Sequence, residues 1–225
     1  MREEAILDAA HQLLGKLGYE EMTMDVVAAE VGIAKASLYK HFPSKEKLAA
    51  RTMTRLFERT ITRLSGLPAE LPAVEKLRRM LEWVLQERLK GSIPHLPSTN
   101  GALEQGLMTD EIYLAALFTL NAALSSLVDQ AKADGALSDE LPTDYIVTTI
   151  YARSCDPTLD YMQRGNSYSG EEIVRHMLHA FFNGISGAGA GVNLAATPSA
   201  AVSASASAPA PAPATDATPT LLKKP

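Results

Sequence analysis

The sequence has few of the features that mark secreted, membrane or β-sheet proteins. A single cysteine, Cys155, in 225 residues excludes an intrachain disulfide, so a reducing cytoplasm is the expected compartment. No alternating Val/Ile/Thr run bounded by turns occurs, which argues against a sheet. The most apolar stretch, residues 114–128, is shorter than a bilayer span and contains polar side chains, so we expect a buried helix and no membrane association. The opening MREEAILDAAHQLL lacks the basic start and continuous apolar run of a signal peptide.

Basic residues are outnumbered by acidic ones overall, but they are concentrated in one place. The formal net charge of −5 argues against a protein that binds nucleic acid over its whole surface. Between residues 34 and 55, however, the basic residues 35, 40, 45, 47, 51 and 55 are opposed only by Glu46. The sequence therefore predicts one local basic face on an acidic protein.

Apolar residues recur with helical spacing along most of the chain, so we predict an all-α fold. Residues 91–108, rich in glycine and proline, are expected to form a loop with at most one short helix. The predicted helices cover residues 2–17, 24–31, 35–42, 45–65, about 72–90, about 109–132, 142–164 with an interruption at Pro157, and 170–185.

Two of these helices have the pattern of a helix-turn-helix. Gly32 separates residues 24–31 from residues 35–42 and suits a tight turn, because glycine adopts positive φ without a Cβ penalty. Leu38 and Phe42, four residues apart, are expected to face inward. The outward face of the second helix is then small and basic, which suits entry into a DNA major groove; it comprises Lys35, Ala36, Tyr39 and Lys40.

Several motifs in this region occur in the order found in a known family. They are Gly18-Tyr19, Thr23 before the second helix, the turn Gly32-Ile33, Ser-Leu-Tyr-x-His-Phe at residues 37–42, and Ser-Lys-Glu-Lys-Leu at residues 44–48 after a proline. Residues 2–50 resemble the DNA-binding domain of the TetR family of bacterial transcriptional regulators. Ala34 departs from the pattern, since the family often has a serine cap there, and losing such a cap costs about 1 kcal/mol.

The resemblance implies a three-part chain: a helix-turn-helix DNA-binding domain at 1–48, a helical regulatory and dimerisation domain at 49–186, and, from composition, a disordered Ala/Pro/Ser-rich tail at 187–225. It implies a homodimer that binds a palindromic operator on double-stranded DNA and is released by an unidentified small-molecule effector, most simply a repressor. The implied base-facing residues are Ala36 and Lys40, with Lys35 close by, and the implied phosphate contacts are Thr23, Ser37, Tyr39, His41 and Lys45.

The regulatory domain offers two further sets of candidates. Mixed aromatic and sparse polar residues are typical of ligand pockets, and the candidates are Met80, Trp83, Tyr113, Phe118, Asn121, Tyr151 and Cys155. An apolar stripe on the last helix is wider than one internal contact needs and fits a dimer interface; it consists of Ile173, Val174, Met177, Leu178, Phe181 and Phe182.

The residues indicate no enzyme, cofactor or metal site. Glu172, His176 and His179 share a helix face, but the histidines are spaced by three residues rather than the four that suit a helical metal pair. No coherent catalytic set is present. An alternative to the ligand-released repressor remains open: a TetR-like DNA-binding protein without a small ligand, acting through protein partners. The sequence specifies neither the effector, nor the operator, nor whether the output is repression or activation.

Overall fold

The computed structural model describes residues 2–93 and 100–184, and the predicted tail at 187–225 lies outside them. The described residues form helices and connecting turns, as predicted. The helices are α1 (Arg2–Glu21), α2 (Met24–Val31), α3 (Lys35–His41), α4 (Lys45–Ser65), α5 (Ala73–Leu89), α6 (Gly101–Met108), α7 (Glu111–Ala133), α8 (Thr143–Ser154), α9 (Thr158–Gly165) and α10 (Gly170–Asn183).

Helix boundaries follow capping residues in the sequence. The side chains of Thr23, Ser44 and Asp110 each accept a hydrogen bond from a backbone N–H in the first turn of α2, α4 and α7. In α1, Gly18 has the non-helical angles φ 79° and ψ 174°. The helix is therefore kinked at the residue where the sequence predicts its end, and one further helical turn continues to Glu21. These local signals explain why most predicted boundaries agree with the structure.

The sequence does not fully determine the helices in two segments, and capping residues explain how each segment folds. Residues 91–108 contain the one short helix that was allowed, α6, which starts where the Asn100 side chain caps Leu103. Residues 142–164 form two helices, because α8 ends at Ser154 and Pro157 begins a new helix at the N-cap of α9.

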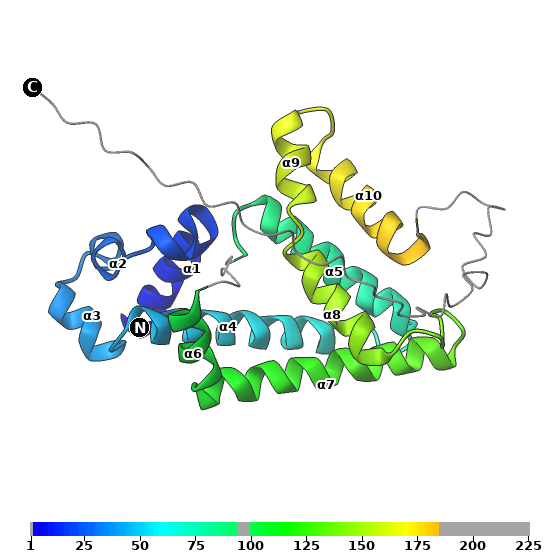
Figure 1. The fold of residues 1–225 in the computed structure, drawn as a ribbon, viewed down its shortest axis with the longest axis horizontal. Helices are drawn as coiled ribbons and strands as arrows, with labels where there is room; N and C mark the ends of the chain where they lie inside the picture. Colours follow the sequence, from blue (N-terminus) through cyan, green and yellow to red (C-terminus); the bar gives the residue numbers. More distant parts are fainter. Residues whose placement is uncertain (1, 94–99, 185–225) are drawn as a thin grey trace, which may run out of the picture. The chain divides into compact units, whose positions relative to one another are not determined.

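The long helices pack side by side and position the small N-terminal ones (Figure 1). Helix α4 packs along α7 and also contacts α1 and α6, so it joins the N-terminal three-helix group to the rest of the fold. Helix α7 in turn contacts α5 and α8, while α10 packs on α5. Helix α4 therefore contacts both α7 and α1.

Helix α7 is the one helix among the described residues that is long and apolar enough to cross a membrane by length and composition; 28% of its most apolar window is buried. A core helix of a soluble protein passes the same test. The helix is longer than the 114–128 stretch on which the sequence argument rested, and it packs against α4, α5 and α8. Its outer side leaves Ile112 and Phe118 exposed.

Candidate DNA interface and regulatory cavity

Helices α2 and α3 meet at a tight glycine corner. Gly32 lies in the left-handed region (φ 72°, ψ 36°), and the N–H of Ile33 donates to the carbonyl of Ala28 at 2.9 Å. The N-cap of α3 is Ala34, which makes no side-chain cap hydrogen bond, as the departure from the family pattern implies. The backbone of the glycine corner thus turns the chain from α2 into α3 without a side-chain cap.

Helix α3 has one buried and one exposed face. Leu38 is 0% and Phe42 is 3% exposed, so both anchor the helix in the core. The side chains predicted to face DNA lie on the other side or at the helix edges. Lys35, Ala36, Tyr39, Lys40 and His41 are exposed, Ser37 is half-buried, and Thr23 is exposed at the start of α2.

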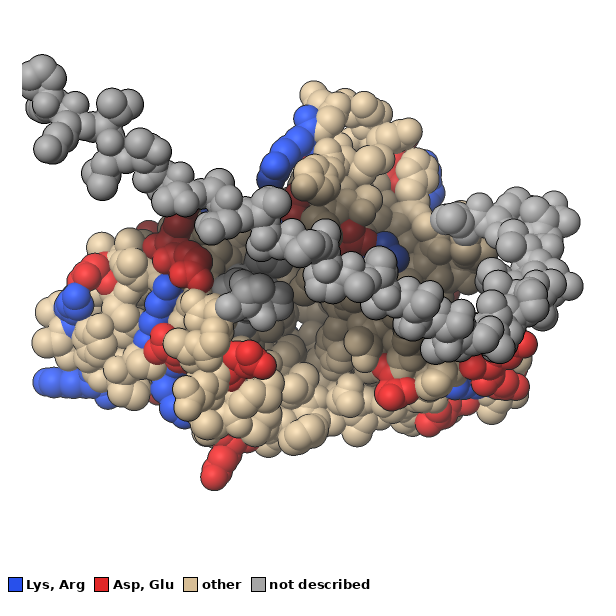
Figure 2. All heavy atoms as spheres, in the orientation of Figure 1, with Lys and Arg blue, Asp and Glu red and all other residues tan. Residues whose placement is uncertain are grey.

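Not all of the basic residues counted in the sequence belong to this face. Lys35 pairs with Asp25 at 2.8 Å across the turn, while Arg55 pairs with Glu4 and Asp8 of α1. Figure 2 shows Lys and Arg at the end of the protein that carries α2 and α3, with acidic side chains among them. The positive face is therefore smaller than the sequence count suggests.

A second cluster joins the end of α1 to the start of α4. The Lys45 ammonium lies 4.0 Å from the Tyr19 ring centre and donates to the Glu20 carbonyl at 3.3 Å. The Tyr19 hydroxyl donates to Glu46 at 2.9 Å. Burial by itself favours protonated Glu46, but hydrogen bonds from its own backbone N–H, Ser44 and Tyr19 outweigh it and lower the Glu46 pKa. The Glu46 side chain is therefore ionised at neutral pH in this cluster.

A third cluster joins the start of α4 to the start of α7. The Lys47 ammonium donates to Asp110 at 2.9 Å, and the other carboxylate oxygen of Asp110 accepts from the Tyr113 backbone N–H at 2.9 Å. Burial opposes ionisation of Asp110, yet these hydrogen bonds and the Lys47 charge lower its pKa. The predicted list of site residues contained neither partner.

Two glycines allow close approach at the same boundary. A Cβ on Gly15 of α1 would lie 2.0 Å from the Gly91 carbonyl oxygen at the end of α5. A Cβ on Gly106 of α6 would lie 2.7 Å from the Glu46 Cβ. The N-terminal helices thus contact the rest of the fold through backbone as well as through ion pairs.

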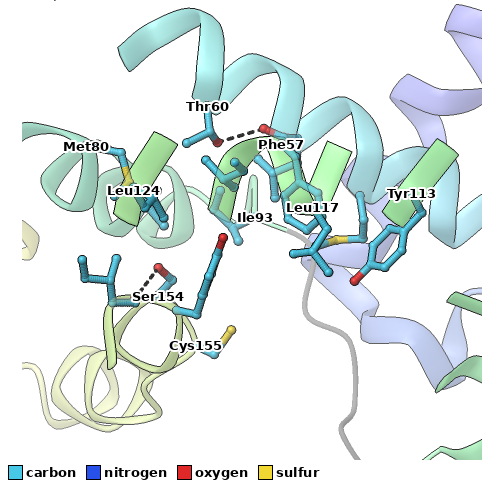
Figure 3. A pocket seen from close by; sticks show the side chains of 15 residues that line it. Phe57, Thr60, Met80, Ile93, Tyr113, Leu117, Leu124, Ser154 and Cys155 are labelled. Atoms are coloured by element: carbon cyan, nitrogen blue, oxygen red, sulfur yellow. Dashed lines mark hydrogen bonds between the residues drawn. The ribbon is translucent and has the colours of Figure 1, made fainter. Parts of the chain in front are cut away.

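Beyond this boundary, α4, α5, α7 and α8 enclose a cavity of about 240 Å³ (Figure 3). The side chains of Phe57, Leu117 and Ser154 converge on it from three helices. Its described lining residues are Met53, Leu56, Phe57, Thr60, Met80, Val84, Ile93, Tyr113, Leu117, Leu120, Leu124, Ile150, Tyr151, Ser154 and Cys155.

The pocket candidates from the sequence divide into two groups. Met80, Tyr113, Tyr151 and Cys155 line the cavity. Trp83, Phe118 and Asn121 are not among its described lining residues. Phe118 is 65% exposed because it follows Leu117 by one position, about 100° around the helix. Trp83 instead packs under the Arg63 guanidinium, 5.1 Å from its ring centre.

The α4 wall of the cavity was missed by sequence reasoning. Met53, Leu56, Phe57 and Thr60 follow i, i+3, i+4, i+7 spacing, which is the pattern of a buried helix face. That spacing is visible in the sequence, but no residue of the helix at 45–65 is among the predicted pocket residues.

The apolar stripe on α10 packs mostly inside the single chain. Ile173, Val174, Met177 and Leu178 are between 1% and 5% exposed, in a cluster with Leu81 and Leu85 of α5. Phe181 and Phe182 are half-buried and pack edge to face, with ring centres 4.9 Å apart. The four buried side chains are therefore internal packing residues, and the exposed side of α10 is the one available to another molecule.

No group of three or more His, Cys, Asp and Glu residues suited to a metal occurs within residues 2–93 and 100–184. Desolvation raises the pKa of the Cys155 thiol, although the nearby Arg88 charge opposes the effect. Cys155 thus stays protonated at neutral pH, which disfavours a reactive thiolate.

Comparison with known families matches the N-terminal helices. The family described as "Bacterial regulatory proteins, tetR family" matches residues 6–52. This range spans α1–α3 and the start of α4, the part that contains the glycine corner and the basic face.

Curated relatives extend the similarity to different lengths. The transcriptional repressor KstR of Rhodococcus jostii is 31% identical over 140 residues, which are 62% of this chain and 57% of that protein. The transcriptional regulator EthR of Mycolicibacterium smegmatis is 26% identical over 195 residues, covering 83% and 87%. The nucleoid occlusion factor SlmA of Vibrio vulnificus is 32% identical over 85 residues, covering 37% and 43%. The matches to KstR and SlmA thus span only about half of those proteins.

Solved structures share the fold over most of the chain. The fatty acid degradation regulator FadR from Bacillus halodurans has a TM-score of 0.63 at 18% identity, covering 82% of this chain and 96% of that one. AibR in complex with isovaleryl coenzyme A and operator DNA has a TM-score of 0.55 at 20% identity, covering 81% and 98%. At this identity the similarity establishes the helical architecture.

Proposed function

This chain belongs to the TetR family of bacterial transcriptional regulators, a non-enzymatic family, and we propose that it is a cytoplasmic repressor released from DNA by a small molecule. It binds a palindromic operator as a homodimer, with residues 1–48 as the DNA reader and residues 49–186 as the regulatory part. The observation that carries the proposal is the ion pair between Lys47 and Asp110, which connects the cavity to the DNA reader.

The DNA contacts proposed for α3 agree with its exposure. Ala36 and Lys40 are assigned to base edges, because a small residue and a long cation on one exposed face allow close approach to a groove. Tyr39 and His41 are assigned to phosphates together with Thr23 and Ser37. Lys45 is assigned to a phosphate beside the N-terminus of α4, where the helix dipole favours an anion.

A homodimer is proposed through the exposed side of α9 and α10. Tyr161 is 69% and Tyr168 is 45% exposed, and the Tyr168 ring meets His176 edge to face with ring centres 5.4 Å apart. Tyrosine is enriched at protein interfaces, since it buries a large ring and keeps a polar tip. Two copies related by a two-fold axis would present two α3 helices to two operator half-sites.

Release by a ligand requires that occupation of the cavity changes the position of the DNA reader. Phe57 of α4 and Tyr113 of α7 both line the cavity, with ring centres 5.6 Å apart. Tyr113 is in the first turn of α7, where Asp110 holds Lys47. A molecule that separates these two rings would shift α4, and with it α1–α3; it acts only if it binds the two positions with unequal affinity.

The alternative is a TetR-like DNA-binding protein that acts through protein partners without a small ligand. Exposed apolar side chains at the end of α6 (Met108) and on α7 (Ile112 and Phe118) are candidates for contact with such a partner. The two functions differ in whether occupation of the cavity changes DNA affinity.

Footprinting on DNA upstream of the gene for this chain, with and without candidate metabolites, tests the proposal. We expect a protected palindrome that a small molecule releases, and a dimer by sedimentation of the free protein. Tyr39→Ala and Lys45→Ala are each expected to weaken binding, and Lys45→Ala to lower the salt slope by about one. Unchanged affinity in both variants contradicts the contact assignment. Protection that no metabolite alters, together with a recruited protein, supports the alternative.

A further inference from the structure

The wall of the cavity is apolar over most of its area. Leucine, isoleucine, methionine and phenylalanine side chains dominate, and none of the described lining residues is Lys, Arg, His, Asp or Glu. Transferring an ion into such surroundings without a partner is far more costly than transferring a neutral molecule. The wall therefore selects against a charged group inside the cavity.

One fully buried polar atom in the described wall lacks a hydrogen-bond partner. The Thr60 hydroxyl donates to the Leu56 carbonyl at 2.8 Å, and the Ser154 hydroxyl donates to the Ile150 carbonyl at 3.0 Å (Figure 3). The Tyr151 hydroxyl, in contrast, is buried and has no hydrogen-bond partner among the described residues. Leaving such a group unsatisfied costs about 1–3 kcal/mol, so a ligand that bonds to it removes a penalty.

The Tyr151 hydroxyl is a hydrogen-bond donor at neutral pH. Burial, with the Tyr113 phenol nearby, raises the pKa of Tyr151 to about 12. It therefore keeps its proton and can donate to a carbonyl, ether or hydroxyl oxygen.

The Arg88 guanidinium next to the Ser154 end of the cavity is already paired, because it donates to the Ser154 carbonyl at 3.0 Å and to Asp160 at 2.8 Å. Arg153, the neighbour of Ser154 in α8, pairs with Asp156, while its Nε has no hydrogen-bond partner among the described residues. Phosphates or a carboxylate at this end would have to compete with these carboxylates. The apolar wall and these existing ion pairs both disfavour an anionic ligand.

The volume limits the ligand to a small molecule. An engineered apolar cavity of about 150 Å³ admits benzene, and this cavity of about 240 Å³ is larger. A single ring with a short side chain, or an aliphatic molecule of similar size, is the size class that fits.

We propose that the effector is a small, neutral, mainly apolar carbonyl compound, such as a ketone or ester, whose oxygen accepts a hydrogen bond from Tyr151. This inference rests on the proposed release by a ligand. The proposed effector differs from the isovaleryl coenzyme A in the AibR structure. The phosphate groups of such a thioester are negatively charged, and the described wall of this cavity contains no Lys, Arg or His to pair with them.

Four probes with one carbon skeleton test the class of ligand. They are butylbenzene without an acceptor, the ketone butyrophenone, the carboxylate phenylbutyrate, and the coenzyme A thioester of phenylbutyrate. Calorimetry with the full chain measures binding, and fluorescence anisotropy of the footprinted DNA measures release. We expect butyrophenone to bind most tightly, butylbenzene about two- to tenfold more weakly, and the two anions more weakly still.

Three variants separate the hydrogen bond from general packing. Tyr151→Phe is expected to reduce butyrophenone affinity to that of butylbenzene and to leave butylbenzene affinity unchanged. Tyr145→Phe removes an exposed hydroxyl from the same helix and serves as the matched control, with both affinities unchanged. Leu117→Phe extends a lining side chain into the cavity and is expected to weaken both ligands.

The outcomes distinguish this inference from the proposed function. Tighter binding of phenylbutyrate or its thioester, equal loss of both neutral ligands in Tyr151→Phe, or binding of no probe overturns the inference about the ligand class. Thioester binding that releases DNA overturns the class but supports the ligand-released repressor. Butyrophenone binding that leaves DNA affinity unchanged supports the class and contradicts release by this ligand.

Discussion

Lys47 and Asp110 form an ion pair of 2.9 Å between the first turn of α4 and the cap of α7. The Lys47 side chain is 43% exposed, whereas the Asp110 side chain is 6% exposed, so the carboxylate is the buried partner. Because Asp110 also caps α7 at Tyr113, one carboxylate serves both the DNA-reading end and the cavity wall.

Asp110→Asn is expected to keep the cap of α7 through the amide oxygen and to lose the charge that holds Lys47. The free energy of unfolding should fall by about 1 kcal/mol, because one charge-assisted hydrogen bond is lost. The ratio of DNA affinities without and with a releasing ligand should move towards one, which anisotropy titrations measure. Glu75→Gln, in an exposed pair with Arg79, is the control. An unchanged ratio in Asp110→Asn would show that coupling takes another path.

Asp25→Asn is expected to tighten DNA binding. Asp25 pairs with Lys35 at 2.8 Å on the face assigned to DNA, so its removal frees a cation and deletes a negative charge near phosphates. The gain should be about two- to fivefold at low salt and should shrink as salt rises. Asp139→Asn, an exposed position between α7 and α8, changes the net charge equally and should leave affinity unaltered. Equal effects of the two substitutions would show that net charge, and not the pair between Asp25 and Lys35, determines the affinity.

His11 is expected to make stability depend on pH. It is buried in α1, and burial, followed by the charges of Arg59 and Arg55, lowers its pKa below the ordinary 6.5. The unfolded chain therefore binds a proton at a higher pH than the folded chain, so stability is greatest above 6.5 and falls as pH decreases below it. Urea unfolding at a series of pH values should show a flatter slope in this range for His11→Gln. Parallel curves for the two proteins would contradict the assignment.

Gly15→Ala is expected to destabilise the contact between α1 and the turn that follows α5. The added Cβ would lie 2.0 Å from the Gly91 carbonyl oxygen, which is backbone and cannot rotate away. The free energy of unfolding should fall by about 1–3 kcal/mol despite the better helix propensity of alanine. Gly101→Ala, where no atom lies within 4 Å of the new Cβ, provides the comparison and should be close to neutral. Thermal unfolding of the two variants measures the difference.

The sequence predicted the local parts of this protein well, because they depend on local signals. Thr23, Ser44 and Gly32 act on their own neighbours, so helix ends and the glycine corner could be placed without tertiary information. The inward positions of Leu38 and Phe42 followed from spacing within one short helix, and both are buried.

The parts that sequence reasoning missed depend on which helices meet. The rotation of α7 decides that Leu117 lines the cavity while Phe118 faces outward, and both look alike in an apolar helix. The stripe on α10 could pack on its own chain or on a second copy; its burial against α5 is set by the tertiary arrangement. Lys47 and Asp110 are 63 residues apart, so no local pattern pairs them.

The close contacts at Gly15 and Gly106 matter for anyone building hybrid sensors from this chain. A graft of residues 1–48 onto another regulatory body would carry Gly15, Glu46 and Lys47, but would leave behind the surfaces that fit them. The recipient must present a backbone carbonyl that packs against Gly15, a glycine that packs against Glu46 and an acidic residue that pairs with Lys47. The transferable unit is thus longer than the DNA reader itself, and recipients can be screened for these three positions before any cloning.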